Sequence, residues 1–352
     1  MWSSSDFRDL VSGRRRGPRA ALLRGALAAV EVPYAWAVRV RNRRYDRVST
    51  TVHRAGVPVI SIGNLTLGGT GKTPLVAWTA RWFRERGVRV AIVSRGYGAE
   101  AGARNDEALE LELQLPDVPH VQDRDRVAAA GVAIEELDCQ LILLDDGFQH
   151  RRLHRDLDVV LLDALEPLGF GHVFPRGTLR EPLAGLARAD VVVLSRADLI
   201  EPRERAQLRQ QVARYAPGAA WCEAVHAPQH LLDRDGNCAS LDVLQAARVA
   251  AFCGIGNPPA FWRTLEALGC HPVAQREFPD HYLYQREDIV DLTQWSSQHG
   301  ADLVVCTRKD LVKLRLLMLG SIPLRAVAIE QSFRAGQDQF EQRLASIADP
   351  IT

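Results

Sequence analysis

A glycine-rich stretch, Gly63–Pro74 (GNLTLGGTGKTP), constrains the fold of this chain more than any other feature of the sequence. The apolar run Val57–Ile62 before it has the composition of a buried strand. Pro74 opens a helical pattern that Gly87 closes. A strand, a glycine-rich turn and the first turn of a helix together direct successive backbone N–H groups at an anion. The sequence therefore predicts a phosphate-binding loop.

The side chains of this loop indicate a nucleotide and Mg²⁺ as ligands. Lys72 would add its charge to the outer phosphates, and the Thr73 hydroxyl would bind Mg²⁺. Lysine is rare here, since Lys72, Lys309 and Lys313 stand beside 41 arginines. Arginine often replaces lysine on a surface, but not where a compact charge must fit. The residues predicted to bind the nucleotide are Gly68, Gly69, Thr70, Gly71, Lys72 and Thr73.

A second motif, Leu141–His150 (LILLDDGFQH), is an apolar strand that ends in Asp145 and Asp146. Such a pair alone is more often a turn or a helix cap than a metal ligand. Downstream of a phosphate loop, however, it lies where a carboxylate meets the nucleotide-bound Mg²⁺. A third stretch, Val192–Leu199 (VVLSRADL), resembles the base-reading motif of GTPases only loosely, and we interpret it as a strand followed by a turn.

The fold class indicated is α/β, with a P-loop NTPase-like parallel sheet domain and a second, smaller α/β domain. In the first domain, apolar runs alternate with helical patterns, as in a parallel sheet covered on both faces. A second series of apolar runs and helical patterns follows later in the chain. The turn-rich stretch Asp233–Ser240 marks the predicted boundary between the two domains. The predicted domains are 56–240 and 241–352, after an arm at 1–55. The predicted strands are 57–62, 88–94, 141–144, 158–163, 190–195, 249–253, 272–278, 303–307 and 324–329, and the predicted later helices are 260–268, 287–299 and 309–319.

The N-terminal arm is strongly basic. Residues 1–54 hold twelve arginines and four acidic residues, a net charge of +8, whereas the remainder carries −7 and the whole chain only +1. The apolar segment Ala20–Val38 is interrupted by Arg24, Glu31 and Pro33, so its uninterrupted runs fall short of the ~20 residues that cross a bilayer. We therefore expect a helix lying in the headgroup region of a membrane. The alternative is a helix packed on the main domain with a solvated basic face.

Two further features limit the class of protein. The net charge of +1 gives no sign of nucleic-acid binding. The six cysteines (Cys139, Cys222, Cys238, Cys253, Cys270 and Cys306) form no C-x-x-C pair. They are expected to be reduced thiols in a reducing compartment, and not a disulfide framework or a zinc site.

Eight stretches in order resemble one family, the tetraacyldisaccharide 4'-kinases of lipid A biosynthesis. They are SIGNLTLGGTGKTPLV (61–76), SRGYG (94–98), DRDRVAAA (123–130), LDDGFQHRRLHRDLD (144–158), RGTLREPL (176–183), FCGIGNPPAFWRTLEALG (252–269), FPDHY (278–282) and TRKDLVKL (307–314). The resemblance implies transfer of the ATP γ-phosphate to the 4'-hydroxyl of an acylated glucosamine disaccharide 1-phosphate. It also implies a peripheral enzyme on the cytoplasmic face of the inner membrane, docked through its arm.

The resemblance also implies roles for individual residues. Asp106 would be the general base, oriented by His281, and Lys72 would act on the transferred phosphate. Asp145, Asp146, Thr73 and Glu181 would organise the metal, while Glu107, Gln149, His150 and Arg180 would line the site. Two positions depart from the family pattern. The residues flanking Asp106–Glu107 are Asn105 and Ala108, where a Gly and a Pro are usual, and Arg308 stands where Glu is common.

Two other functions share the same loop. One is a P-loop nucleotide hydrolase acting as a switch or a metallocentre-loading ATPase, against which stands Leu67 at the place of that group's extra lysine. The other is a non-catalytic nucleotide-binding regulator with a membrane anchor. Nothing in the sequence indicates an obligate protein partner.

Overall fold

The computed structural model of the chain describes residues 4–47, 52–96, 111–112, 114–280 and 282–351. The chain forms two compact units, which are described separately. Apart from the segment Gly96–Asp117, which belongs to the second unit, the chain passes from the first unit to the second within β7 (Ala220–Leu232) and returns within β13 (Ile322–Ala335). The first unit comprises Met1–Arg95, Val118–Val225 and Gln331–Thr352, and the second comprises Gly96–Asp117 and His226–Glu330.

This division differs from the predicted boundary at 240/241. The stretch Asp233–Ser240 is no linker, because it forms the turn that joins β7 to β8 (Cys238–Ala239) inside the second unit. The Asp233 carboxylate accepts hydrogen bonds from the backbone N–H groups of Asp235 and Asn237 and so closes that turn. The turn-forming residues were recognisable in the sequence, but their place inside a hairpin was not.

The first unit contains a parallel sheet in the order β7-β6-β5-β1-β4-β2-β3. Every residue of β1 is buried, and β1 pairs with β4 on one side and β5 on the other. The strands predicted from apolar runs are confirmed, with ends shifted by a few residues. Their bounds are β1 (Val59–Asn64), β2 (Val90–Ser94), β4 (Leu141–Asp145), β5 (Leu157–Asp163) and β6 (Val191–Ser195), and the short edge strand β3 (His120–Gln122) was not predicted.

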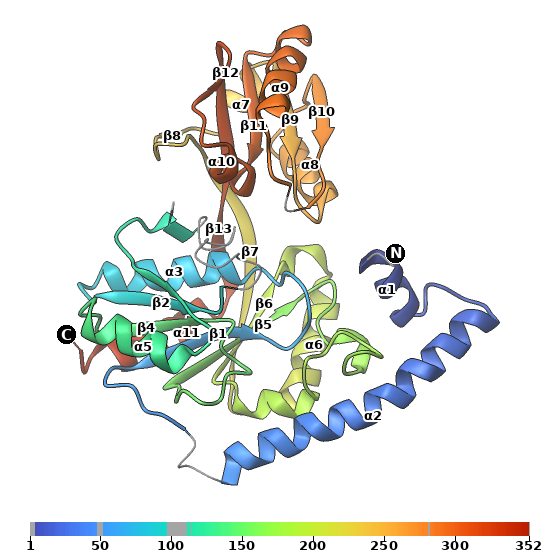
Figure 1. Cartoon of the computed structure of the whole chain (residues 1–352), viewed down its shortest axis with the longest axis vertical. Helices are drawn as coiled ribbons and strands as arrows, with labels where there is room; N and C mark the ends of the chain where they lie inside the picture. The colour runs from blue at the N-terminus through green and yellow to red at the C-terminus, as the bar shows by residue number, and fades with distance from the viewer. Residues whose placement is uncertain (1–3, 48–51, 97–110, 113, 281, 352) are drawn as a thin grey trace. The chain divides into compact units, whose positions relative to one another are not determined.

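Helices cover the strands of the first unit (Figure 1). α3 (Lys72–Arg84) lies on the opposite side of the strands from α5 (Arg126–Glu135), and Trp78 of α3 stacks on Phe340 of α11 at 5.5 Å between ring centroids. α3 begins before Pro74, which is tolerated because the first N–H groups of a helix have no intrahelical acceptor. The remaining elements are α6 (Pro202–Ala213), α11 (Gln337–Ala348) and the 3₁₀ turns η2 (Gly169–Gly171), η3 (Leu183–Arg188) and η4 (Ala197–Leu199).

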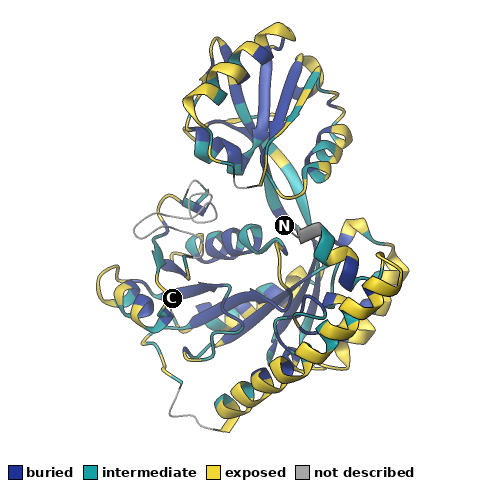
Figure 2. Cartoon of the chain, turned by 45° about the vertical axis from the view of Figure 1, so that its right-hand side comes forward, coloured by how far each residue is buried: buried dark blue, intermediate teal, exposed yellow. Residues whose placement is uncertain are grey.

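The arm consists of α1 (Ser4–Val11) and one continuous helix, α2 (Pro18–Arg47). The expected helix is confirmed, and Pro33 lies inside it without ending it. Glu31 lies on the inner side of the helix, where it accepts a hydrogen bond from the Val173 N–H (2.8 Å) and pairs with His172. Ala20, Ala35 and Val38 are buried on the same side. The arm is therefore packed on the first unit while its outer side stays exposed (Figure 2).

Among the described residues, α2 is the one helix long and apolar enough, by length and composition, to cross a membrane. Only 11% of its most apolar window is buried in the protein. A continuous helix of this kind differs from the short interrupted runs that the sequence suggested. The charged Glu31 satisfies its hydrogen bonds within the protein and so does not interrupt the exposed side.

The second unit is a smaller α/β sheet in the order β10-β9-β11-β13, in which each neighbouring pair is parallel. Phe261 and Leu265 of α8 pack on one face, and Leu292 and Trp295 of α9 on the other. α10 ends at Leu314, not at 319 as predicted, and β12 pairs with β13 directly afterwards. The bounds are α7 (Val243–Ala246), β9 (Val249–Cys253), α8 (Pro258–Ala267), β10 (Ala274–Glu277), α9 (Arg286–Gln298), β11 (Leu303–Thr307), α10 (Arg308–Leu314) and β12 (Met318–Leu319).

All six cysteines lie in the described part of the chain and are free thiols. Five are buried, and only Cys238 is exposed. Burial raises the pKa of Cys139 to about 11 and that of Cys222 to about 12. These thiols are therefore protonated and unreactive at neutral pH, as structural cysteines are.

Candidate active site

The glycine-rich loop has the backbone conformation that its sequence requires. It connects the end of β1 at Asn64 to the start of α3 at Lys72. Gly68 and Gly71 have positive φ angles of 112° and 82°, which other residues rarely adopt. The Asn64 side-chain amide donates to the Thr70 hydroxyl at 3.0 Å and holds the loop from within. The positive end of the α3 dipole and the Lys72 side chain thus lie at the same loop, as a phosphate site needs.

Two residues from β6 and its following turn also hold this loop, although the sequence motif there was interpreted as an ordinary strand and turn. The Ser195 hydroxyl donates to the Thr70 carbonyl at 2.7 Å. The Arg196 guanidinium donates to the Gly69 carbonyl at 3.1 Å and pairs with Asp163 at the end of β5. No local signal in the sequence identified them, because their role depends on β6 lying two strands away from β1 in the sheet.

The predicted acid pair lies at the carboxyl end of β4, next to the loop. Asp145 is the last residue of β4, and Asp146 follows with a φ of 54°, a conformation that is uncommon outside glycine. Its N–H donates to the Ile62 carbonyl of β1 at 2.9 Å. A side chain at Gly63 would collide with Phe148, since a Cβ there would lie 2.7 Å from the Phe148 Cβ. Glycine at 63 therefore allows the acid turn to approach the phosphate loop.

Asp146 connects the acid pair to two cations. Its carboxylate lies 3.5 Å from the Lys72 Nζ and 2.7 Å from the Arg180 guanidinium. Burial raises the pKa of this carboxyl, but the charges of Lys72 and Arg180 outweigh burial and lower the pKa below its ordinary value. Asp146 is thus a carboxylate at neutral pH. The structure brings together these three predicted residues.

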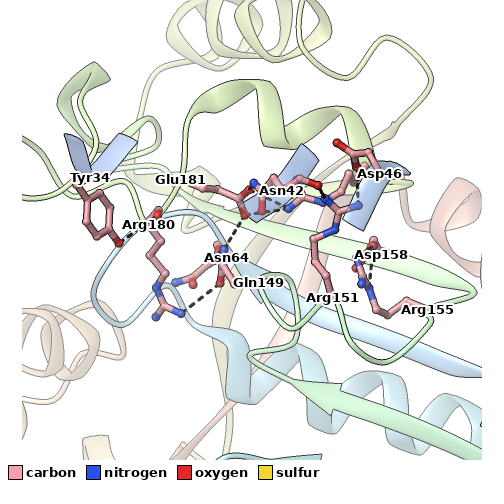
Figure 3. A network of polar contacts seen from close by, with 11 residues as sticks. Tyr34, Asn42, Asp46, Asn64, Gln149, Arg151, Arg155, Asp158, Arg180 and Glu181 are labelled. Atoms are coloured by element: carbon pink, nitrogen blue, oxygen red, sulfur yellow. Dashed lines mark hydrogen bonds and ion pairs between the residues drawn. The ribbon is translucent and has the colours of Figure 1, made fainter. Parts of the chain in front are cut away.

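Gln149 and His150 follow the acid pair and lie in the same region. Gln149 donates to the Asn64 carbonyl at 2.9 Å, so it is attached to the base of the phosphate loop (Figure 3). Burial, together with the nearby positive charge of Arg126, lowers the pKa of His150 to about 4. His150 is therefore a neutral imidazole at physiological pH. Its Nε2 is buried and has no hydrogen-bond partner among the described residues, which makes it available to a ligand.

Glu181 is the residue for which the resemblance implied a role in organising the metal. Its carboxylate is fully buried and accepts hydrogen bonds from Asn42, Gln149 and Arg188. Within the described ranges there is no group of three or more His, Cys, Asp or Glu side chains that could hold a metal ion. Glu181 is thus held by donors from three separate segments, and its role in organising the metal stays a prediction.

The remaining donors fit Mg²⁺. Asp145, Asp146 and the Thr73 hydroxyl in the first turn of α3 are hard oxygen ligands from two adjacent elements. Mg²⁺ at nucleotide sites is usually held by only one or two protein carboxylates, and phosphates and water complete its coordination. A small set of protein ligands is thus what a nucleotide-bound Mg²⁺ requires.

Three predicted site residues, Asp106, Glu107 and His281, lie outside the described residues. In the sequence, these positions come after β2 and β10. Their predicted roles stay predictions.

Comparisons with known proteins decide the family. The family model described as tetraacyldisaccharide-1-P 4'-kinase matches residues 23–349. The chain belongs to this family. A tetraacyldisaccharide 4'-kinase from Anaeromyxobacter dehalogenans (strain 2CP-C) is 41% identical over 94% of this chain and 92% of its own length. One from Geobacter sulfurreducens is 37% identical over 92% of this chain and 94% of its own.

A solved structure of the tetraacyldisaccharide-1-P 4'-kinase family agrees with the fold. It is the "apo" form of LpxK from Aquifex aeolicus in complex with ATP, which is similar with a TM-score of 0.76 and 28% identity. The similarity covers 92% of this chain and 99% of that chain. The family resemblance and the P-loop α/β fold predicted from the sequence motifs are therefore confirmed.

Proposed function

We propose that the centre formed by Lys72, Asp146 and Arg180 carries out the reaction of this protein, which is an ATP-dependent kinase. The kinase transfers the γ-phosphate of ATP to the 4'-position of the tetraacyldisaccharide lipid A precursor. The observation that carries the assignment of the site is the ion-paired trio itself, in which Lys72 begins α3 and Asp146 directly follows the strand β4. Phosphoryl transfer depends mainly on positioning and on charges aimed at the transferred group, and this trio supplies both.

Different side chains of the site would bind the phosphates, bind Mg²⁺ and orient the transferred group. The N–H groups at the start of α3 and the Lys72 ammonium would hold the β- and γ-phosphates. Asp145, Asp146 and Thr73 would hold Mg²⁺, which neutralises the charge of the phosphates when it is bound. Arg180 keeps Asp146 ionised and adds a cation beside the transferred group. The neutral His150 would donate or accept a hydrogen bond without adding charge.

For the acceptor hydroxyl, we propose Asp106 as the general base and His281 as its orienting partner. A sugar hydroxyl is a weak nucleophile, so a carboxylate that accepts its proton in the transition state lowers the barrier. The adjacent Glu107 is the alternative base. This assignment rests on the match of the two motifs to the family.

The arm is proposed to dock the enzyme on the cytoplasmic face of the inner membrane, where its lipid acceptor lies. Leu22, Val32, Trp36 and Val40 are 75%, 68%, 65% and 45% exposed. At 100° per residue they fall on one side of α2, opposite the buried Ala20, Ala35 and Val38. We call these four residues the arm face. Exposed arginines occur towards both ends of the helix, at Arg19, Arg39, Arg41, Arg43, Arg44 and Arg47.

This combination favours an anionic membrane surface. Apolar side chains between clusters of arginine insert at the headgroup boundary, while each arginine gains about 1 kcal/mol near anionic lipid. A hollow of about 410 Å³ includes Val32 of the arm face in its lining, which is largely apolar and also contains the charged Glu31 and Arg39. Apolar surface of this kind suits an acylated acceptor. The reduced cysteines are consistent with a cytoplasmic location.

Acceptor dependence of ATP turnover tests the proposed function. ADP release by the purified protein should require the detergent-dispersed tetraacyldisaccharide 1-phosphate and should stay near background with a 4'-deoxy analogue. A P-loop hydrolase acting as a switch or a metallocentre-loading ATPase would release ADP without any acceptor. Equal ADP release with and without the acceptor would overturn the kinase assignment.

A further inference from the structure

A buried carboxylate links the arm to the catalytic side of the first unit. Glu181 is 0% exposed. Its Oε2 accepts a hydrogen bond from the Asn42 side-chain amide of α2 at 2.8 Å, and its Oε1 accepts one from Gln149 at 3.1 Å. Arg188 of η3 donates to both oxygens, at 2.9 and 3.0 Å. Each donor fixes the carboxylate from a different element, and Asn42 is the one that comes from the arm (Figure 3).

The same network continues to the phosphate loop. The Gln149 side-chain oxygen lies 3.5 Å from the Arg180 guanidinium, which also binds Asp146 at 2.7 Å. Asp146 in turn lies 3.5 Å from the Lys72 Nζ. Each step orients the next side chain, since an amide or guanidinium held by one partner presents its remaining groups in a fixed direction.

A second contact ties the arm to the loop that follows β4. Arg151 is next in the chain to His150, and its guanidinium donates to the Asn42 carbonyl at 2.9 Å and to Asp46 at 2.6 Å. It also lies over the Tyr45 ring, 5.5 Å from its centroid. The last two turns of α2 are thus attached to the segment that carries Gln149 and His150.

We propose that Asn42 is a positioning residue for phosphoryl transfer, through which α2 fixes Glu181 and, by way of Gln149 and Arg180, the Asp146–Lys72 pair. This rests on the proposed function of that site. The proposed role of Asn42 goes beyond membrane attachment, because catalysis would then depend on the packing of α2 against the first unit. A side chain at position 42 that cannot donate a hydrogen bond to Glu181 should slow turnover even when no membrane is present.

The variant Asn42→Asp gives this proposal a distinctive signature. It has the same shape, but a carboxylate replaces the donor that faces Glu181. Two carboxylates in contact cannot both stay ionised, so the pair takes up a proton as the pH falls, and the protonated pair again has a donor. The charged groups around it are Arg188 on Glu181, Arg151 on the Asn42 carbonyl, and Asp46 on Arg151.

The experiment measures turnover with detergent-dispersed acceptor at saturating ATP, as a ratio to wild type, from pH 8 to pH 6. Asn42→Asp should be on the order of 10–100-fold slower at pH 8 and should recover most of this loss at pH 6. Ala21→Asp is the matched control. Ala21 is exposed on the same helix, so the variant has the same change of charge without touching Glu181, and its ratio should stay near one throughout.

Asn42→Ala provides a test that does not depend on a buried charge. It should lower turnover by roughly tenfold at every pH while vesicle binding stays at the wild-type level, because one hydrogen bond to a charged group is lost. The proposal is overturned if both Asn42 variants stay within twofold of Ala21→Asp. An Asn42→Asp deficit that does not change with pH would also overturn it. If wild type itself transfers no phosphate to the acceptor, the proposed function fails instead.

Discussion

Arg196 illustrates how one side chain outside a motif can set the shape of the phosphate loop. Its guanidinium joins Asp163 of β5 to the Gly69 carbonyl. A hydrogen bond from a charged donor contributes about 1.5–3 kcal/mol, and every 1.4 kcal/mol is a tenfold change in affinity. Arg196→Ala should therefore raise the KM for ATP by roughly tenfold or more, with a smaller change in kcat.

Steady-state kinetics over a range of ATP concentrations would measure this effect. Arg203→Ala is the matched control, because Arg203 is exposed on α6 and should leave KM unchanged. A KM for Arg196→Ala equal to that of the control would show that the loop keeps its shape without the guanidinium.

His150 makes a prediction about pH and stability. Its pKa is about 4 in the folded protein, because burial and Arg126 disfavour the charged ring, against about 6.5 in an unfolded chain. Below pH 6.5 the unfolded chain binds the proton more readily, so the folded state loses stability as the pH falls from 6.5 towards 4. His150→Gln removes this titration. Between pH 6.5 and 4.5, wild type should lose on the order of 1–2 kcal/mol more than the variant in urea unfolding, after allowance for solvent screening. Parallel losses in both proteins would contradict a depressed pKa.

Local sequence motifs predicted those parts of the site whose residues are neighbours in the chain. The Gly63–Pro74 loop and the Asp145–Asp146 turn belong to single strand-to-loop segments, and the structure places both as expected. Ser195 and Asn42 were missed because their contacts depend on the order of the strands and on how the arm packs. Sequence spacing carries no such information. Glu181 was found through the family motif, but its partners were not.

At the scale of elements, α2 combines two functions on two sides. Its inner side supplies Glu31 and Asn42 to the protein, and its outer side is the arm face. The apolar run in the sequence was read as interrupted, since a residue list does not show that Glu31 turns inward. A deletion of residues 1–47 would remove both sides together, so substitutions on the arm face are the sharper test of membrane binding.

Replacing Leu22, Trp36 and Val40 with serine should weaken flotation with anionic vesicles by at least about tenfold, because each apolar side chain contributes on the order of 1 kcal/mol when it is buried in lipid. Turnover with detergent-dispersed acceptor should stay close to wild type. The control replaces three exposed apolar residues far from the arm in the sequence, Val132, Leu137 and Leu199, with serine. Equal flotation of the two triple variants would rule out the arm face as the membrane contact.

At the scale of the whole molecule, the proposed base and its partner come from segments 175 positions apart in the sequence. Asp106→Asn should lower turnover by roughly 10²–10⁴ with little effect on ATP affinity, the usual range for a lost general base. His281→Ala should have a similar effect. If the two residues act as one unit, the double variant should be barely slower than either single variant.

Single-turnover rates of the four proteins would measure this coupling. Additive losses would mean that Asp106 and His281 have separate roles and do not act as one unit. A nearly silent Asp106→Asn would instead identify Glu107 as the base. Both results would leave the phosphate loop assignment standing.

The most direct test of the central claim follows the label from γ-³²P-ATP in one reaction with wild type and Lys72→Ala. Thin-layer separation of the lipid should show label at the 4'-position of the disaccharide with wild type. With Lys72→Ala the rate should fall on the order of 10³-fold at saturating ATP, since the lysine contact strengthens in the transition state. Label released as inorganic phosphate in place of labelled lipid, or more than about a tenth of wild-type transfer by Lys72→Ala, would contradict the account.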